Sequence, residues 1–124
     1  MEIEIGGKKY QTKCSAYTRF EYKQIFGVGI FKDLAKLNDL NIKQEAIRES
    51  MKDKSEEEIQ NAINMALLED IDEFIDTIER ITYIFIKDNQ GVGSFKDWLQ
   101  SLEKIELSDS WIQEVTELAV SSFC

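Results

Sequence analysis

The chain has 124 residues, 43% of them hydrophobic and 31% charged, a composition that fits one soluble globular domain with a single core. Its 24 acidic and 15 basic side chains give a formal net charge of −9, which argues against a general nucleic-acid binder because such proteins need a basic face. The sequence contains no proline, which favours long helices, and no histidine, which removes the commonest general base and metal ligand.

The start of the chain predicts a β-hairpin over residues 2–14. Apolar and polar residues alternate on both sides of Gly6-Gly7, and two glycines can adopt the positive φ angles of a tight hairpin turn. A lone hairpin is marginally stable in water. We therefore expect its apolar face, with Ile3 and Tyr10, to rest on helices or on another chain.

Three helices are predicted next, over residues 15–26, 30–40 and 42–51. Ser15 is the candidate N-cap of the first helix, which is rich in aromatic residues and ends at Gly27 as a glycine C-cap. The second has apolar residues along one face. The third has the weakest apolar pattern of the chain.

The longest apolar pattern covers residues 56–87, and we expect the other elements to cover it. Ser55 with Glu58 forms a capping-box pattern at its start, and apolar residues then recur in steps of three and four. One unbroken helix would be about 50 Å long at roughly 1.5 Å per residue, so we also allow a bend near residues 69–72.

Two further helices are predicted over residues 94–105 and 109–122. Ser94 with Asp97 forms a second capping-box pattern, and both segments carry clean apolar faces. Together the elements predict a mainly α fold. It is a small helical domain, a single domain of residues 1–124, whose N-terminal β-hairpin packs on an antiparallel helical bundle.

Few residues of this sequence can support catalysis. Cys14 and Cys124 form no metal-binding motif, and neither has an identifiable base nearby. The absence of histidine also excludes serine–histidine and cysteine–histidine dyads. We therefore expect no enzyme activity, no catalytic residue, no metal site and no cofactor.

The densest polar cluster is acidic and lies within residues 69–76. Four of its side chains fall on one side of a helix, namely Glu69, Asp72, Glu73 and Asp76. The spacing lacks the glycine and ligand order of a calcium-binding loop, and a rigid helix presents its carboxylates outward. A solvated face is the simplest interpretation, a surface for a basic partner is the alternative, and a metal site is the least favoured.

The charge is also uneven along the chain. Residues 1–54 hold 11 basic and 8 acidic side chains, a balance of +3, whereas residues 55–124 hold 4 and 16, a balance of −12. Two differently charged solvated faces explain this pattern. The alternative is an electrostatically guided contact, between copies of the chain or with a basic partner.

The aromatic residues fit core faces, and core packing is the simplest interpretation of each. The alternative is that residues 1–37 expose more apolar surface than a monomer tolerates and form an interface. The candidate partner-contacting or groove-lining residues are Tyr17, Phe20, Phe31, Trp98 and Trp111.

The sequence contains no stretch of about 18 apolar residues, so it predicts no membrane-spanning segment. Residues 1–4 are acidic and lack the basic and apolar regions of a signal peptide. We therefore expect a cytoplasmic protein.

Taken in order, these elements resemble the tail assembly chaperones of long-tailed phages and prophages with non-contractile tails. The resemblance rests on the hairpin turn, on an aromatic helix before a charged middle and a long apolar helix, and on one helix start near the end. In sequence these are Ile3-Glu4-Ile5-Gly6-Gly7-Lys8-Lys9-Tyr10, Phe26-Gly27 and Ser94-Phe95-Lys96-Asp97-Trp98-Leu99. None of these motifs is a catalytic signature.

The resemblance implies a mostly helical, non-enzymatic, self-associating protein of the bacterial host cytoplasm. Such a protein binds the tape measure protein, helps recruit tail tube subunits and is absent from the mature virion. The resemblance implies neither membrane association nor direct nucleic-acid binding. Two alternatives remain open: a small tail or head-completion protein retained in the virion, and an acidic regulatory protein that binds a basic partner.

Overall fold

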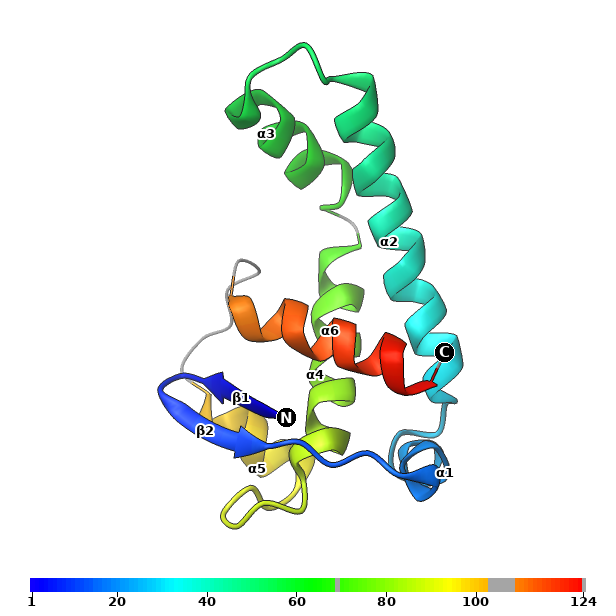
Figure 1. The fold of residues 1–124 in the computed structure, drawn as a ribbon, viewed down its shortest axis with the longest axis vertical. Helices are drawn as coiled ribbons and strands as arrows, with labels where there is room; N and C mark the ends of the chain where they lie inside the picture. Colours follow the sequence, from blue (N-terminus) through cyan, green and yellow to red (C-terminus); the bar gives the residue numbers. More distant parts are fainter. Residues whose placement is uncertain (69, 103–108, 124) are drawn as a thin grey trace.

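The computed structural model describes residues 1–68, 70–102 and 109–123. Two strands and six helices lie within these ranges (Figure 1). In chain order they are β1 (Glu2–Ile5), β2 (Lys8–Gln11), α1 (Ala16–Phe26), α2 (Ile30–Ser50), α3 (Glu56–Ala66), α4 (Ile71–Ile86), α5 (Phe95–Ser101) and α6 (Ser110–Phe123). The expected fold class, a mainly helical domain with an N-terminal hairpin, is confirmed. Our expectations for Glu69, for the end of the 94–105 helix and for Cys124 lie outside the described residues.

The hairpin forms as the sequence predicts. β1 and β2 pair antiparallel with Ile3 opposite Tyr10, and Gly6 and Gly7 have φ angles of +60° and +84°. Such angles are easy only for glycine, which explains the two consecutive glycines at this turn. Ile3 and Tyr10 are buried in the main core, where β1 packs against α6. The expectation that this face rests on helices is therefore confirmed.

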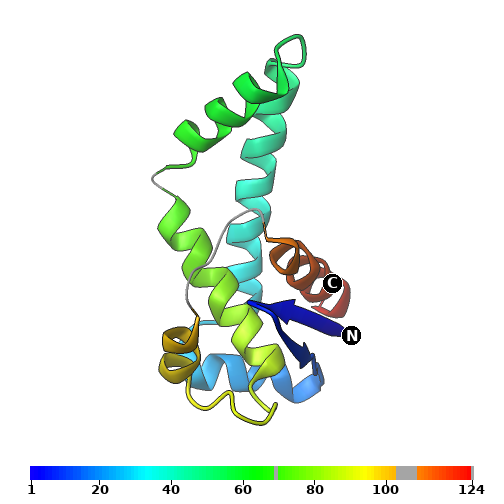
Figure 2. The same ribbon diagram turned by 90° about the vertical axis from the view of Figure 1, so that its left-hand side faces the viewer.

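Helix α4 is the central element of the fold. It contacts α1, α2, α5 and α6, and four of its residues, Ile78, Ile81, Phe85 and Ile86, are almost completely buried. Figure 2 shows α6 and the hairpin on one side of α4 and α5 on the other. Within the described ranges, no helix has both the length and the apolar character needed to cross a membrane.

Residues 30–50 form one helix, α2, and not the two helices expected over 30–40 and 42–51. No glycine or proline interrupts this stretch, so nothing in the local sequence ends a helix near Asn41. The weak apolar pattern of the second half is explained by its packing, because this half adds only a few apolar side chains to the small cluster that it shares with α3. At about 1.5 Å per residue, α2 is about 31 Å long.

The range 56–87 contains two helices, α3 and α4, so the continuous helix expected there is not formed and the alternative of an interruption near residues 69–72 is. α3 ends at Ala66, and α4 begins at Ile71. In the observed arrangement Asp72 and Glu73 occupy the first turn of α4, where the helix dipole favours carboxylates.

The predicted helix caps are also present. The Ser15 hydroxyl accepts a hydrogen bond from the Tyr17 N–H at 3.3 Å, and the Ser15 N–H donates to Thr18 Oγ1 at 2.9 Å. Gly27 ends α1 in the left-handed conformation. Ser94 caps α5 through a bond from the Asp97 N–H at 3.1 Å, and the Ser55 hydroxyl accepts from the Glu58 N–H at 3.2 Å.

The molecule has two parts of unequal size. Residues 40–68, the second half of α2 with α3, form a helical hairpin that extends away from the rest of the fold (Figure 1), and we call it the arm. The other described residues are called the body. The arm has its own small buried cluster, Leu40, Ile59, Ile63 and Leu67, and Phe74 packs against both this cluster and the main core.

Candidate partner-binding site

The acidic residues predicted on α4 are exposed, but some of them pair with α2. Asp72, Glu73 and Asp76 all lie on the surface. Glu73 forms an ion pair with Lys36 at 2.8 Å, and Asp70 forms one with Lys43 at 3.0 Å. These two pairs connect the start of α4 to α2. Glu73 and Asp70 therefore help to hold the two helices together.

The acidic residues do not form a metal site. Within the described ranges, no group of three or more aspartate, glutamate or cysteine side chains converges in a way that suits a metal ion. Glu79 lies on the same side of α4 as Asp76, and partial burial together with the charge of Asp76 raises the pKa of its carboxyl, although Arg80 opposes this shift. The carboxylates of Asp76 and Glu79 on this side of α4 therefore repel each other.

Three of the predicted contact residues are accessible to a partner. Tyr17 and Phe20 lie on the outer face of α1 with 56% and 52% of their surface exposed, and their ring centroids are 5.7 Å apart. Phe31, near the start of α2, is 49% exposed. Large aromatic rings in contact with water are unfavourable for an isolated protein. Tyr17 and Phe20 therefore form a small apolar surface, which we call the α1 patch.

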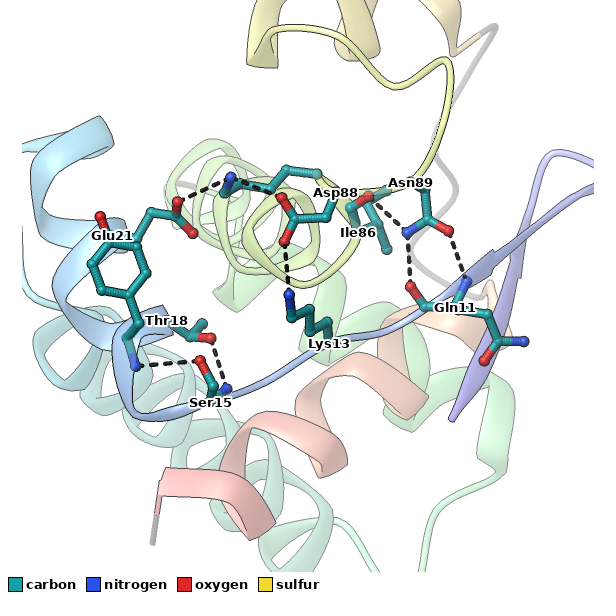
Figure 3. A network of polar contacts seen from close by, with 10 residues as sticks. Gln11, Lys13, Ser15, Thr18, Glu21, Ile86, Asp88 and Asn89 are labelled. Atoms are coloured by element: carbon teal, nitrogen blue, oxygen red, sulfur yellow. Dashed lines mark hydrogen bonds and ion pairs between the residues drawn. The ribbon is translucent and has the colours of Figure 1, made fainter.

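A polar network fixes α1 and the hairpin to the end of α4 (Figure 3). Lys87 bonds Glu21 of α1 at 3.0 Å, and this bond, followed by the neighbouring Asp88, raises the pKa of the lysine despite partial burial. Asn89 donates to the Gln11 carbonyl at 2.8 Å and accepts from the Gln11 N–H at 3.2 Å. The face of α1 that carries Glu21 is therefore held inward, and the α1 patch faces solvent.

Trp98 and Trp111 are core residues, with 1% and 4% of their surface exposed. Trp98 packs against the rings of Tyr83 and Phe95. Both tryptophans also line a hollow of about 710 Å³ beside the hairpin turn, so they are core residues at the wall of a groove. Their burial leaves little surface for a partner to contact.

A cleft that the sequence analysis missed lies between α2, α3 and α4, where the arm meets the body. Its volume is about 800 Å³. Most of its lining is apolar and comprises Leu40, Ile63, Leu67, Leu68, Ile71 and Phe74. Gln44, Gln60, Asn64 and Asp70 supply the polar lining. Leu68 is 62% exposed, so the cleft presents apolar surface directly to water.

The break between α3 and α4 creates this cleft. A single straight helix would keep α3 in line with α4, whereas the interruption after Ala66 lets α3 fold back on the second half of α2. The bond between Lys43 and Asp70 connects α2 to the start of α4 beside this cleft. The only sequence signals for the cleft were the amphipathic pattern of α3 and the acidic residues at the break.

A second feature that sequence reasoning missed is a buried polar network in the body. The Tyr22 hydroxyl donates to the carboxylate of Asp33, which is fully buried, and Arg80 Nε donates to the same oxygen of Asp33 at 3.2 Å. Arg80 also donates to Thr77 at 3.2 Å. Burial, then the bond to Asp33, raises the pKa of Tyr22. The network joins α1, α2 and α4 and is enclosed by packed helices, which is typical of a structural role.

No protein-family model matches this chain, and comparisons with curated proteins and with solved structures give no match either. The surfaces described above, and the resemblance carried by the sequence motifs, are therefore the basis for a functional proposal.

Proposed function

We propose that this protein is a phage tail assembly chaperone, which acts by stoichiometric binding without catalysis. The observation that carries the proposal is that a small, acidic, helical protein exposes apolar surface at two places, the α1 patch and the cleft. A chaperone for long hydrophobic helices needs such surface. The resemblance in the sequence supplies the identity of the partners, which are the tape measure protein and the tail tube subunits.

The proposed mechanism is the transfer of apolar side chains of the partner from water onto these surfaces. Each square ångström of apolar surface removed from water contributes about 25 cal/mol. The net charge of −9 keeps the loaded complex soluble, because like-charged complexes repel one another. The protein acts in the host cytoplasm, associates with itself and leaves before the tail matures.

Coexpression with the tape measure protein tests this proposal. We expect the tape measure protein to become soluble and to co-elute with this chain in size-exclusion chromatography. A double variant, Tyr17→Ser with Phe20→Ser, changes two exposed side chains, so it should fold normally and solubilise less partner. A tape measure protein that stays insoluble while this chain elutes alone would overturn the proposal. Detection of this chain in purified particles would instead favour a virion structural protein.

One observation favours a second candidate, an acidic regulatory protein that binds a basic partner. Asp72 and Asp76 are exposed on α4, and neither has an ion pair among the described residues. Binding through such a surface weakens steeply with added salt. A partner captured without tail proteins, and released by moderate salt, would support this candidate over the chaperone.

A further inference from the structure

We propose that the cleft between α2, α3 and α4 binds one amphipathic α-helix of a partner protein, whose apolar ridge enters the cleft and whose flanks carry Lys and Arg. The inference rests on the proposed function, because it describes the kind of segment that the chaperone would recognise in its partner. It concerns the cleft alone and not the α1 patch.

The lining of the cleft fits a helix. Six of its lining residues are apolar, and they come from three helices that surround an open space of about 800 Å³. An amphipathic helix that lies in such a groove inserts side chains spaced i, i+3 or i+4, and i+7. The exposed Leu68 at one edge would lose contact with water when the helix is bound. The amide groups of Gln44, Gln60 and Asn64 can hydrogen-bond polar side chains beside the ridge.

The charge around the cleft determines which charged side chains are favoured on the flanks of the bound helix. The described residues of 55–86 include one basic side chain, Arg80, which is bonded to Asp33. The same residues include eight acidic ones, of which Glu56, Asp70 and Glu73 form ion pairs with Arg48, Lys43 and Lys36 of α2. The other five, Glu57, Glu58, Asp72, Asp76 and Glu79, form no ion pair within the described ranges, and α2 holds four basic and four acidic side chains, so the surroundings of the cleft are acidic on balance. Glu57 lies one helical turn before Gln60, and Asp72 follows Ile71; both Gln60 and Ile71 line the cleft. Complementarity of charge therefore favours Lys and Arg on the bound helix.

The same charge disfavours the acidic helices α3 and α4 of a second copy as the occupant. Each copy carries a net charge of −9, and its own α3 and α4 are acidic. An acidic helix brought to an acidic rim is repelled. The occupant we propose is a basic amphipathic helix of a different protein.

A synthetic peptide tests the proposal without any tail protein. The probe is a fluorescein-labelled 18-residue peptide of leucine and lysine with its leucines on one helical face, and the comparator replaces each lysine by glutamate. Binding to the full-length protein is measured by fluorescence anisotropy at physiological salt. We expect the lysine peptide to bind at least about tenfold more tightly than the glutamate peptide.

Two neighbouring substitutions separate the cleft from the general acidity of the surface. Asn64→Trp places a large ring in the cleft from an exposed lining position, whereas Met65→Trp places the same ring on the next residue, which is 73% exposed and does not line the cleft. We expect Asn64→Trp to weaken peptide binding about tenfold and Met65→Trp to leave it within about twofold. If Asn64→Trp does not fold, as judged by circular dichroism, Leu68→Lys is the second variant and should give the same loss.

Equal effects of the two tryptophan variants, or equal binding of the two peptides, would overturn the cleft proposal. Failure of the proposed function is distinguishable from this result. If the lysine peptide binds in the cleft but the tape measure protein is not solubilised, the cleft proposal stands and the chaperone proposal falls. If the tape measure protein co-elutes and Asn64→Trp has no effect on either binding measurement, the cleft proposal falls alone.

Discussion

The body and the arm are built from the same kind of helix but are held together very differently. In the body, the side chains of Trp98, Tyr22 and Phe85 are almost fully buried around α4, and a buried carboxylate is bonded to two partners. In the arm, four buried residues form the whole cluster, and the pair between Arg48 and Glu56 is largely exposed. Exposed ion pairs contribute little, typically less than about 1 kcal/mol.

This difference indicates which part of the molecule opens most easily. Local opening is easiest where few apolar side chains are buried. The arm buries few apolar side chains and also forms two walls of the cleft. We therefore expect that α3 can shift against α2 to fit a bound helix. The body supplies the third wall through Ile71 and Phe74 of α4, whose C-terminal half is anchored in the main core. We expect the free energy of opening to be lower in the arm than in the body.

The largest effect should come from breaking the polar network of the body. Asp33→Ala leaves Arg80 and Tyr22 without their buried partner, so we expect a loss of about 3–5 kcal/mol in the free energy of unfolding. Urea unfolding followed by circular dichroism measures this loss. Asp39→Ala, on an exposed position of the same helix, is the control and should change stability by no more than about 0.5 kcal/mol. Equal results for the two variants would show that the network does not hold the body together.

A matched pair of cavity variants compares the two cores directly. Ile78 in the body is fully buried, and Ile59 in the arm is 7% exposed. Isoleucine-to-alanine changes typically lose about 2–5 kcal/mol, and the loss is smaller where the surroundings can collapse. We expect Ile78→Ala near the upper end and Ile59→Ala near the lower end, with faster hydrogen exchange confined to the arm in the second variant. Similar losses with exchange throughout the chain would show that arm and body unfold as one unit.

The elements that sequence reasoning predicted correctly depend on residues close together in the chain. The hairpin follows from Gly6-Gly7 between two alternating segments, and the caps at Ser15, Gly27 and Ser94 involve neighbours within four residues. The place where α3 ends and folds back on α2 depends on contacts that are not local. Nothing within the sequence of α2 shows that α3 supports its second half.

The candidate site was predicted less well for the same reason. Tyr17 and Trp98 both lie near the start of a helix with a serine N-cap, yet one is exposed and the other is buried, because only the three-dimensional fold decides which aromatic face is covered. The cleft requires α2, α3 and α4 at once, and the contact between Tyr22, Asp33 and Arg80 spans up to 58 positions. No local pattern predicts either feature.

The pH dependence of stability tests the network of Tyr22, Asp33 and Arg80 with a smaller expected effect. Burial and Asp33 raise the pKa of Tyr22 above its ordinary value of 10.0, so the folded state favours the neutral phenol. The stability that this provides is fully present below pH 10 and is lost as the pH rises further. Tyr22→Phe should lose about 0.5–1.5 kcal/mol at pH 7 through the missing hydrogen bond.

The slope of the melting temperature against pH is the decisive readout for this variant. Tyr83 also has a raised pKa because of burial, so the wild-type protein and the variant share that contribution. We therefore expect the melting temperature to fall less steeply above about pH 9 in Tyr22→Phe than in the wild type. Parallel curves for the two proteins would contradict the assignment of the pH dependence to Tyr22.

The smallest effect should come from the acidic side of α4, at a position in the body. Partial burial and Asp76 raise the pKa of Glu79, so folding favours its protonated form; this contribution is present below the ordinary value of 4.5 and is lost as the pH rises through the folded pKa. Glu79→Gln should therefore stabilise the protein at pH 7 by no more than about 0.5 kcal/mol, and the gain should shrink near pH 4. Thermal unfolding at the two pH values measures it. A loss of stability at pH 7 would show that attraction to Arg80 outweighs burial and repulsion, and that the carboxylate belongs to the network that holds the body.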